Sequence, residues 1–187
     1  SATPTPSPVP TLSPLPTPRP TPTASPTPLS KPTLRRTLLE SRTVAVVGWH
    51  PVAVVSGGGS VWMANTFDDS ITKLSPDGTV LDTFPVGKGP GALAFDGEHL
   101  WVANTGLTAA DDDVDDLPPG TVSMLTVEGE IVGEFPVGRW PVALAFDGEA
   151  LWVANVLDKS VMRLALDGSS IGEIVLDLRP VAVAVVG

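Results

Sequence analysis

Short runs of apolar and β-branched residues alternate with turn residues over most of the chain. One set of four such runs occupies residues 142–146, 151–155, 161–166 and 171–176. Asp-Gly pairs separate many of the runs, as at residues 147–148, and this dipeptide favours tight hairpin turns. From Thr43 onward the 3.6-residue spacing of an amphipathic helix is absent. This pattern predicts an all-β domain in which antiparallel strands follow one another in groups of four.

The four-strand unit recurs along the chain. It reads PVALAFDGEALWVAN from Pro141, PGALAFDGEHLWVAN from Pro90 and PVAVVSGGGSVWMAN from Pro51, and the shorter PVAVAVVG starts at Pro180. The spacings are 39, 51 and 39 residues, and the middle one is longer because an Asp-rich insertion lies near residues 106–119. A repeat of about 40 residues with four strands is typical of a propeller blade. We therefore predict blades at approximately 51–89, 90–140 and 141–179, with partial-blade strands at 33–50 and 180–187.

The repeat carries a family resemblance. PVALAFDGEALWVAN, followed by SVMRLALDGSSIGEIV, resembles the YVTN and NHL type of β-propeller repeat, and the likeness covers residues 43–187. The repeat pattern is also similar to that of virginiamycin B lyase-like propellers. The resemblance implies a β-propeller and a secreted or cell-surface location. It leaves the function open, because one fold hosts many activities.

The lyase likeness would imply a histidine-containing catalytic set at a propeller mouth. The two histidines of the chain, His50 and His99, occupy dissimilar repeat positions and reproduce no such set. We therefore expect no catalytic residues and no enzyme activity.

The two ends of the repeat region would each leave a sheet edge without a partner. Bare apolar edges promote association, and because these two edges differ, their contact would be head-to-tail. Such a contact closes into a ring or grows into a filament, and we expect the filament. The alternative is a closed, four-bladed monomer that joins its own end strands. The residues expected to pair between protomers are Thr43, Val44, Ala45, Val46 and Val47 with Val181, Ala182, Val183, Ala184, Val185 and Val186.

Residues 1–32 form a low-complexity arm. They contain 12 prolines and 12 serines or threonines, a composition that favours polyproline II and cannot build a core. The arm is a flexible linker or stalk, a glycosylated mucin-like stalk, or a basic strap that locks an assembly. The candidate acceptors for O-linked glycans are Thr3, Thr5, Ser7, Thr11, Ser13, Thr17, Thr21, Thr23, Ser25 and Thr27.

Charge divides the chain at the same boundary as composition. Residues 1–42 carry a net charge of +4 and the remainder −14, which argues against nucleic acid as a partner. The absence of cysteine excludes disulfides, thiolate metal sites and cysteine nucleophiles. No apolar run approaches the length of about 18–20 residues that spans a bilayer, and the first residues lack the pattern of a signal peptide.

Four sets of residues are candidates for particular roles. The carboxylates of Asp111, Asp113 and Asp115 could bind calcium, although acidic loops are more often simply solvated. No other cofactor is indicated. Trp62, Trp101 and Trp152 recur at one repeat position and are expected to pack between blades, and Asn65, Asn104 and Asn155 are expected to pair with backbone groups. Trp49 and Trp140 are candidates for a partner surface.

Taken together, these features predict an extracellular structural protein that assembles from copies of itself and carries a proline-rich arm. A closed propeller that binds a ligand at its mouth, displayed on a surface stalk, is the main alternative. A lyase-like enzyme is a weaker one.

Overall fold

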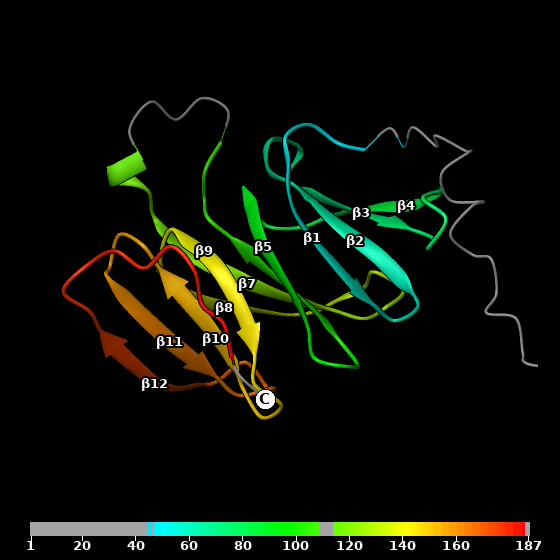
Figure 1. Cartoon of the computed structure of the whole chain (residues 1–187). Helices are drawn as coiled ribbons and strands as arrows, with labels where there is room; N and C mark the ends of the chain where they lie inside the picture. Colours follow the sequence, from blue (N-terminus) through cyan, green and yellow to red (C-terminus); the bar gives the residue numbers. More distant parts are fainter. Residues whose placement is uncertain (1–44, 46, 109–113, 186–187) are drawn as a thin grey trace, which may run out of the picture.

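The computed structural model describes residues 45, 47–108 and 114–185, in which the chain forms three four-stranded antiparallel sheets (Figure 1). The first blade contains β1 (Pro51–Gly57), β2 (Ser60–Asn65), β3 (Ser70–Leu74) and β4 (Val80–Pro85). The second contains β5 (Pro90–Phe95), β6 (Leu100–Asn104), β7 (Pro119–Leu125) and β8 (Ile131–Arg139). The third contains β9 (Pro141–Phe146), β10 (Leu151–Asn155), β11 (Ser160–Leu164) and β12 (Ser170–Val175). The prediction of an all-β fold built from four-stranded blades is confirmed.

Each blade is a meander in which every strand pairs with the next one in sequence. Short turns make this possible, as between β9 and β10, where Gly148 has a φ of +94°. In the described ranges the only helical pieces are two short 3-10 turns, η1 (Thr66–Asp68) and η2 (Val114–Asp116). These ranges contain no helix long and apolar enough to cross a membrane.

The blades stack face to face along an arc, with β1, β5 and β9 next to one another on its inner side (Figure 1). The core between the first and second blades contains Trp62, Ile71, Leu100, Val102 and Leu125. The core between the second and third blades contains Ala94, Trp101, Val122, Val137, Leu151, Val153 and Leu164. The middle blade is therefore covered on both faces, whereas the first and third blades each keep one face outside these cores.

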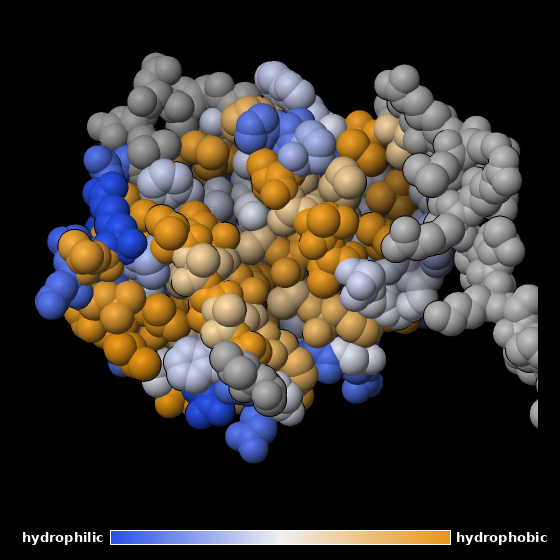
Figure 2. Space-filling view, in the orientation of Figure 1, coloured by the Kyte–Doolittle hydropathy of each residue, from blue (hydrophilic) through white to orange (hydrophobic). Residues whose placement is uncertain are grey.

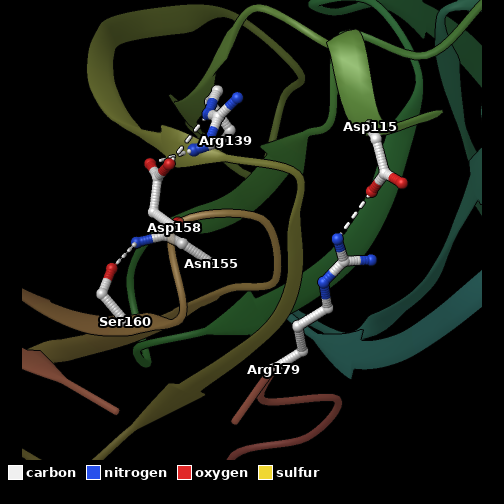
Figure 3. Close-up of polar contacts among 6 residues, drawn as sticks. All are labelled: Asp115, Arg139, Asn155, Asp158, Ser160 and Arg179. Carbon is white, nitrogen blue, oxygen red and sulfur yellow. Dashed lines mark hydrogen bonds and ion pairs between the residues drawn. The ribbon is translucent and has the colours of Figure 1, made fainter. Parts of the chain in front are cut away.

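The insertion of the second blade lies between β6 and β7. Its side chain Leu117 is 4% exposed and so anchors the end of the insertion that leads into β7. The guanidinium of Arg179 donates to the Asp115 carboxylate at 2.7 Å, which ties the insertion to the end of the third blade (Figure 3).

Candidate interaction surfaces

The repeated tryptophans define one face of every blade. Trp62 and Trp101 are 0% exposed, because the following blade covers each of them. Trp152 occupies the same position in the third blade, where no further blade follows among the described residues, and it is half-buried. The face of the third blade that carries Trp152, Val161, Arg163 and Ile174 is called its free face below; strand register places these four side chains on one side of the sheet.

Aspartates hold two of the tryptophans. The indole N–H of Trp101 donates to Asp96 at 2.8 Å, and that of Trp152 donates to Asp147 at 2.7 Å. In the first blade the indole of Trp62 donates to the Gly57 carbonyl at 3.2 Å instead. These aspartates were not predicted as site residues, although the repeat carries a signal for them: an aspartate stands five residues before the tryptophan in two of the three units.

Hydrogen bonds keep both aspartates ionised. The Trp152 indole, the backbone N–H groups of Glu149 and Ala150, and the Arg163 charge lower the pKa of Asp147 from 3.8 to about 2. Burial acts to raise the pKa of Asp96, but bonds from the His99 and Glu98 backbone and the Trp101 indole outweigh it and lower the pKa. The same carboxylate therefore closes the hairpin and orients the tryptophan.

A cavity of about 430 Å³ lies on the free face of the third blade. Arg163 covers one part of this face, with its guanidinium carbon 5.4 Å from the centre of the Trp152 ring. The C-terminal segment, defined here as residues 180–185, folds back over the face (Figure 1). The residues that line the cavity are Asp147, Trp152, Val161, Ile174, Leu176, Val183, Ala184 and Val185.

The C-terminal segment differs from the expected strand. Residues 180–185 belong to none of the strands or sheets of the described residues. Two of its valines are well exposed, Val181 at 79% and Val185 at 40%. Of the other residues expected to exchange strands, Ala45 and Val47 lie outside any strand, and Thr43, Val44, Val46 and Val186 lie outside the described residues.

The two residues just before each blade form the same pair of backbone hydrogen bonds in all three blades. The His50, Gly89 and Trp140 carbonyls accept bonds of 3.0–3.1 Å from the N–H groups of Thr66, Thr105 and Val156. The preceding carbonyls of Trp49, Lys88 and Arg139 accept from the next N–H groups, at 3.0–3.4 Å. Residues 88–89 and 139–140 continue from β4 and β8, the outermost strands of the blades before them. Trp49 and His50 thus enter the first blade in the way that the residues after an outermost strand enter the second and third blades.

The first blade also has a free face, which carries Val52, Val54 and Met63. Val52 is 46% exposed and Val54 is 63% exposed, and with Met63 they line a hollow of about 240 Å³. On the side of the molecule that Figure 2 shows, apolar residues gather over the middle and over the third blade. The two ends of the arc are therefore both apolar.

The repeated asparagines pair with hydroxyl groups, where backbone groups had been expected. The amide nitrogens of Asn65 and Asn104 each donate to two Ser or Thr hydroxyls of the following strand, at 2.8–3.1 Å. Asn155 donates only to Ser160, at 3.2 Å (Figure 3), because Met162 replaces the second hydroxyl residue. The register that places these hydroxyls beside the asparagines could not be derived from the sequence.

Among the described residues, the remaining candidates are not brought together in one site. Asp111 and Asp113 lie outside the described residues, and Asp115 pairs with Arg179. The described part of the chain holds no group of three His, Asp or Glu side chains that could bind a metal. Trp49 is 62% exposed and packs edge-on against Phe67 at 5.3 Å, whereas Trp140 is half-buried. The candidate glycan acceptors all lie in the arm, outside the described residues.

The two histidines lie in separate environments. His99 Nδ1 is 3.6 Å from the Asp96 carboxylate, next to the hairpin that this aspartate closes. The His50 ring packs against Phe67 with their centres 4.6 Å apart.

Comparison with known proteins supports the fold. No protein-family profile matches the chain, and no curated protein matches it. Hydrazine synthase of Kuenenia stuttgartiensis is similar with a TM-score of 0.60 and 19% identity, over 76% of this chain and 41% of the other. Virginiamycin B lyase of Staphylococcus aureus gives a TM-score of 0.54 at 21% identity, over 71% and 44%. The computationally designed Ika4 protein gives 0.62 at 13% identity, over 78% and 85%.

The chain spans less than half the length of the first two of these proteins. At such identities the likeness concerns the fold alone. It agrees with the three stacked sheets: the chain has a β-propeller-type fold.

Proposed function

We propose that this chain is a structural protein that assembles head-to-tail from copies of itself. In the proposed contact one blade is shared between two copies. The C-terminal segment of one copy provides its innermost strand, and residues 43–47 of the next copy provide its outermost strand. The carrying observation is that residues 49–50 meet the first blade through the same backbone bonds that residues 88–89 and 139–140 make to the second and third blades.

The position of the C-terminal segment supports the other half of the shared blade. Its sequence PVAVAVVG repeats the innermost strands PVALAF and PVAVVS. Val183, Ala184 and Val185 lie over Trp152, where the neighbouring blade lies over Trp62 and over Trp101. A further strand in this place would pack against the tryptophan-bearing face of a blade, as the innermost strands do elsewhere in the molecule.

The free faces offer enough apolar surface to drive such an association. Val54 is 63% exposed, Ile174 52% and Val181 79%. Complete burial of one such side chain contributes about 1.5–3 kcal/mol, whereas association costs at least about 4 kcal/mol in lost motion. Several of these residues buried together would exceed that cost, so the contact needs both blade faces and the C-terminal segment.

The same proposal places the protein outside the cell and assigns it no catalytic role. The Ser/Thr/Pro composition of the arm, which is typical of O-glycosylated stalks, supports the location. The separate environments of His50 and His99 support the absence of a histidine-based catalytic set.

Deletion of residues 180–187 tests the assembly. The intact chain should form assemblies visible by electron microscopy and sedimenting well above the mass of one 19.3 kDa chain. The deletion variant should sediment as a monomer with an unchanged far-UV circular dichroism spectrum, because the described strands all lie before residue 176. A variant lacking residues 1–32 serves as the control and should still assemble. Unchanged assembly size after deletion of 180–187 would refute the shared blade.

Ligand binding at the blade entrances is a second candidate, favoured by one observation. A hollow of about 170 Å³ is lined by His50, Trp140, Thr66 and Thr105, among others. His50 and Trp140 both have left-handed backbone, with φ of +57° and +56°, which is costly for side chains of this size. If the hollow binds small aromatic molecules, a monomeric chain should show saturable quenching of tryptophan fluorescence, lost in Trp140→Gly. Unchanged quenching in that variant would exclude the hollow.

A further inference from the structure

We propose that the cavity between the C-terminal segment and the third blade binds an extended apolar peptide, which takes the place of the second strand of a further blade. The ligand belongs to a stated class: a peptide strand with apolar side chains at alternate positions, as in the chain's own Leu-Trp-Val-Ala-Asn. The site uses the face on which the proposed assembly rests, but peptide binding does not require the copies to assemble.

The floor of the cavity matches such a strand. Inside the molecule, Leu100 and Val102 of β6 pack in one core with Trp62, and Leu151 and Val153 of β10 pack in one core with Trp101. Each blade thus presents its tryptophan to the leucine and valine of the next Leu-Trp-Val motif. Trp152 is the third such tryptophan, and the cavity lies on it.

The C-terminal segment provides a strand edge beside that floor. Every innermost strand in the described blades pairs with a second strand: β1 with β2, β5 with β6 and β9 with β10. Residues 181–185 repeat the innermost sequence but form no backbone hydrogen bonds with the rest of the described chain. Their N–H and C=O groups are therefore available for strand addition, in which main-chain bonds supply affinity and side-chain pockets supply specificity.

The remaining lining selects an apolar ligand. Val161, Ile174 and Leu176 extend the apolar floor beside Trp152. The one carboxylate in the lining, Asp147, already accepts bonds from Trp152, Glu149 and Ala150. A bound peptide would therefore meet hydrocarbon on the floor and backbone groups along Val183–Val185. A charged side chain on its floor-facing side would lose its hydration there, and Arg163, which lies over Trp152, already pairs with Asp147 and Glu149.

Fluorescence anisotropy with a labelled synthetic peptide tests this site. The peptide carries the sequence HLWVANT, and the protein is the full chain at a concentration where sedimentation shows a monomer. We expect saturable binding to the wild type. The control peptide has aspartate in place of the leucine and valine and should bind at least about tenfold more weakly, since it would bury unpaired charge.

Protein variants locate the binding. Val161→Asp places a charge on the floor and should weaken binding by about tenfold or more. The matched control Val132→Asp alters a side chain of β8 that is 50% exposed and does not line the cavity, so binding should not change. If Val161→Asp unfolds the blade, amide exchange of the wild type provides the second measurement: the peptide should slow exchange at residues 181–185.

The outcomes separate the two proposals. No binding up to the solubility limit of the peptide, or equal binding by Val161→Asp and wild type, overturns the peptide site and leaves the assembly untouched. Peptide binding by a chain that never assembles supports the site and refutes the assembly. If both hold, excess peptide should leave the sedimenting mass of the assemblies unchanged, because the peptide takes the second-strand place, which neither copy fills in the shared blade.

Discussion

One aspartate stabilises both a hairpin and a tryptophan in the second and third blades. Asp96 accepts bonds from two backbone N–H groups and from the Trp101 indole, and its side chain is 3% exposed. Asparagine would keep the shape but remove the charge that strengthens these bonds. Asp96→Asn should therefore lower the free energy of unfolding by about 1 kcal/mol at pH 7, measured by urea denaturation. The Glu98→Gln variant, next to it in the turn, should unfold like the wild type.

Asp147 gives the same bond network a pH dependence. Its pKa is about 2 in the folded chain, below the ordinary value of 3.8, so its stabilisation is complete above about pH 4 and is lost as the pH falls towards 2. Asp147→Asn should be less stable than the wild type at pH 7, and this difference should shrink between pH 4 and pH 2. Urea denaturation at pH 7, 4, 3 and 2 measures it. A difference that stays constant over this range would contradict the role of the carboxylate charge.

Alanine variants of two turn glycines distinguish the cost of backbone strain from the cost of side-chain overlap. Gly148 and Gly168 have φ values of +94° and +80°. A Cβ at Gly148 would meet nothing within 4 Å, whereas one at Gly168 would overlap the Phe135 ring. Gly148→Ala should cost about 1–2 kcal/mol through backbone strain alone, and Gly168→Ala about 1–3 kcal/mol more through overlap with the ring. Equal midpoints of thermal unfolding for the two variants would show that Phe135 moves aside freely.

At the level of strands and blades, sequence reasoning succeeded where the signal was local. The Asp-Gly turns and the β-branched runs of the third unit predicted β9 to β12, because each hairpin joins strands that are neighbours in sequence. The pairing of Asn65 with Ser70 and Thr72 was missed, since it depends on the register between β2 and β3. The path of residues 180–185 could not be predicted either: their sequence indicates a strand, but a strand forms only beside a partner.

The tryptophans provide a test at the level of the blade interface. Trp101 is fully enclosed by two blades, and Trp152 has the same sequence context but a cavity on its exposed side. Trp101→Ala should lower the free energy of unfolding by about 3–5 kcal/mol, as deletion of a buried aromatic side chain does. Trp152→Ala should cost a monomeric chain clearly less, because its side chain already lies partly outside the core. Unfolding is followed by circular dichroism, because removal of a tryptophan changes the fluorescence signal. Equal losses would show that the C-terminal segment buries Trp152 as completely as a blade buries Trp101.

For the whole molecule, two forces could hold copies together, and salt distinguishes them. The first 42 residues carry a net charge of +4 and the rest −14, so a basic arm lying on an acidic neighbour would be held by charge. The free faces of the first and third blades are apolar, and their contact would be held by burial. At 1 M salt, screening reduces the range of charge interactions to about 3 Å. The free energy gained by burying apolar surface persists at this salt concentration and is increased by sulfate.

We expect burial to dominate. Assemblies of the intact chain should keep their sedimenting mass from low salt to 1 M sodium chloride, and sodium sulfate should lower the concentration at which they form. The variant without residues 1–32 removes most of the prolines but leaves Arg35, Arg36 and Arg42, so a second variant with these three arginines replaced by serine completes the control. Both should assemble at the wild-type concentration. Dissociation in 1 M sodium chloride, together with failure of the arginine variant to assemble, would instead identify the basic residues as the contact and leave the blade faces without a role in it.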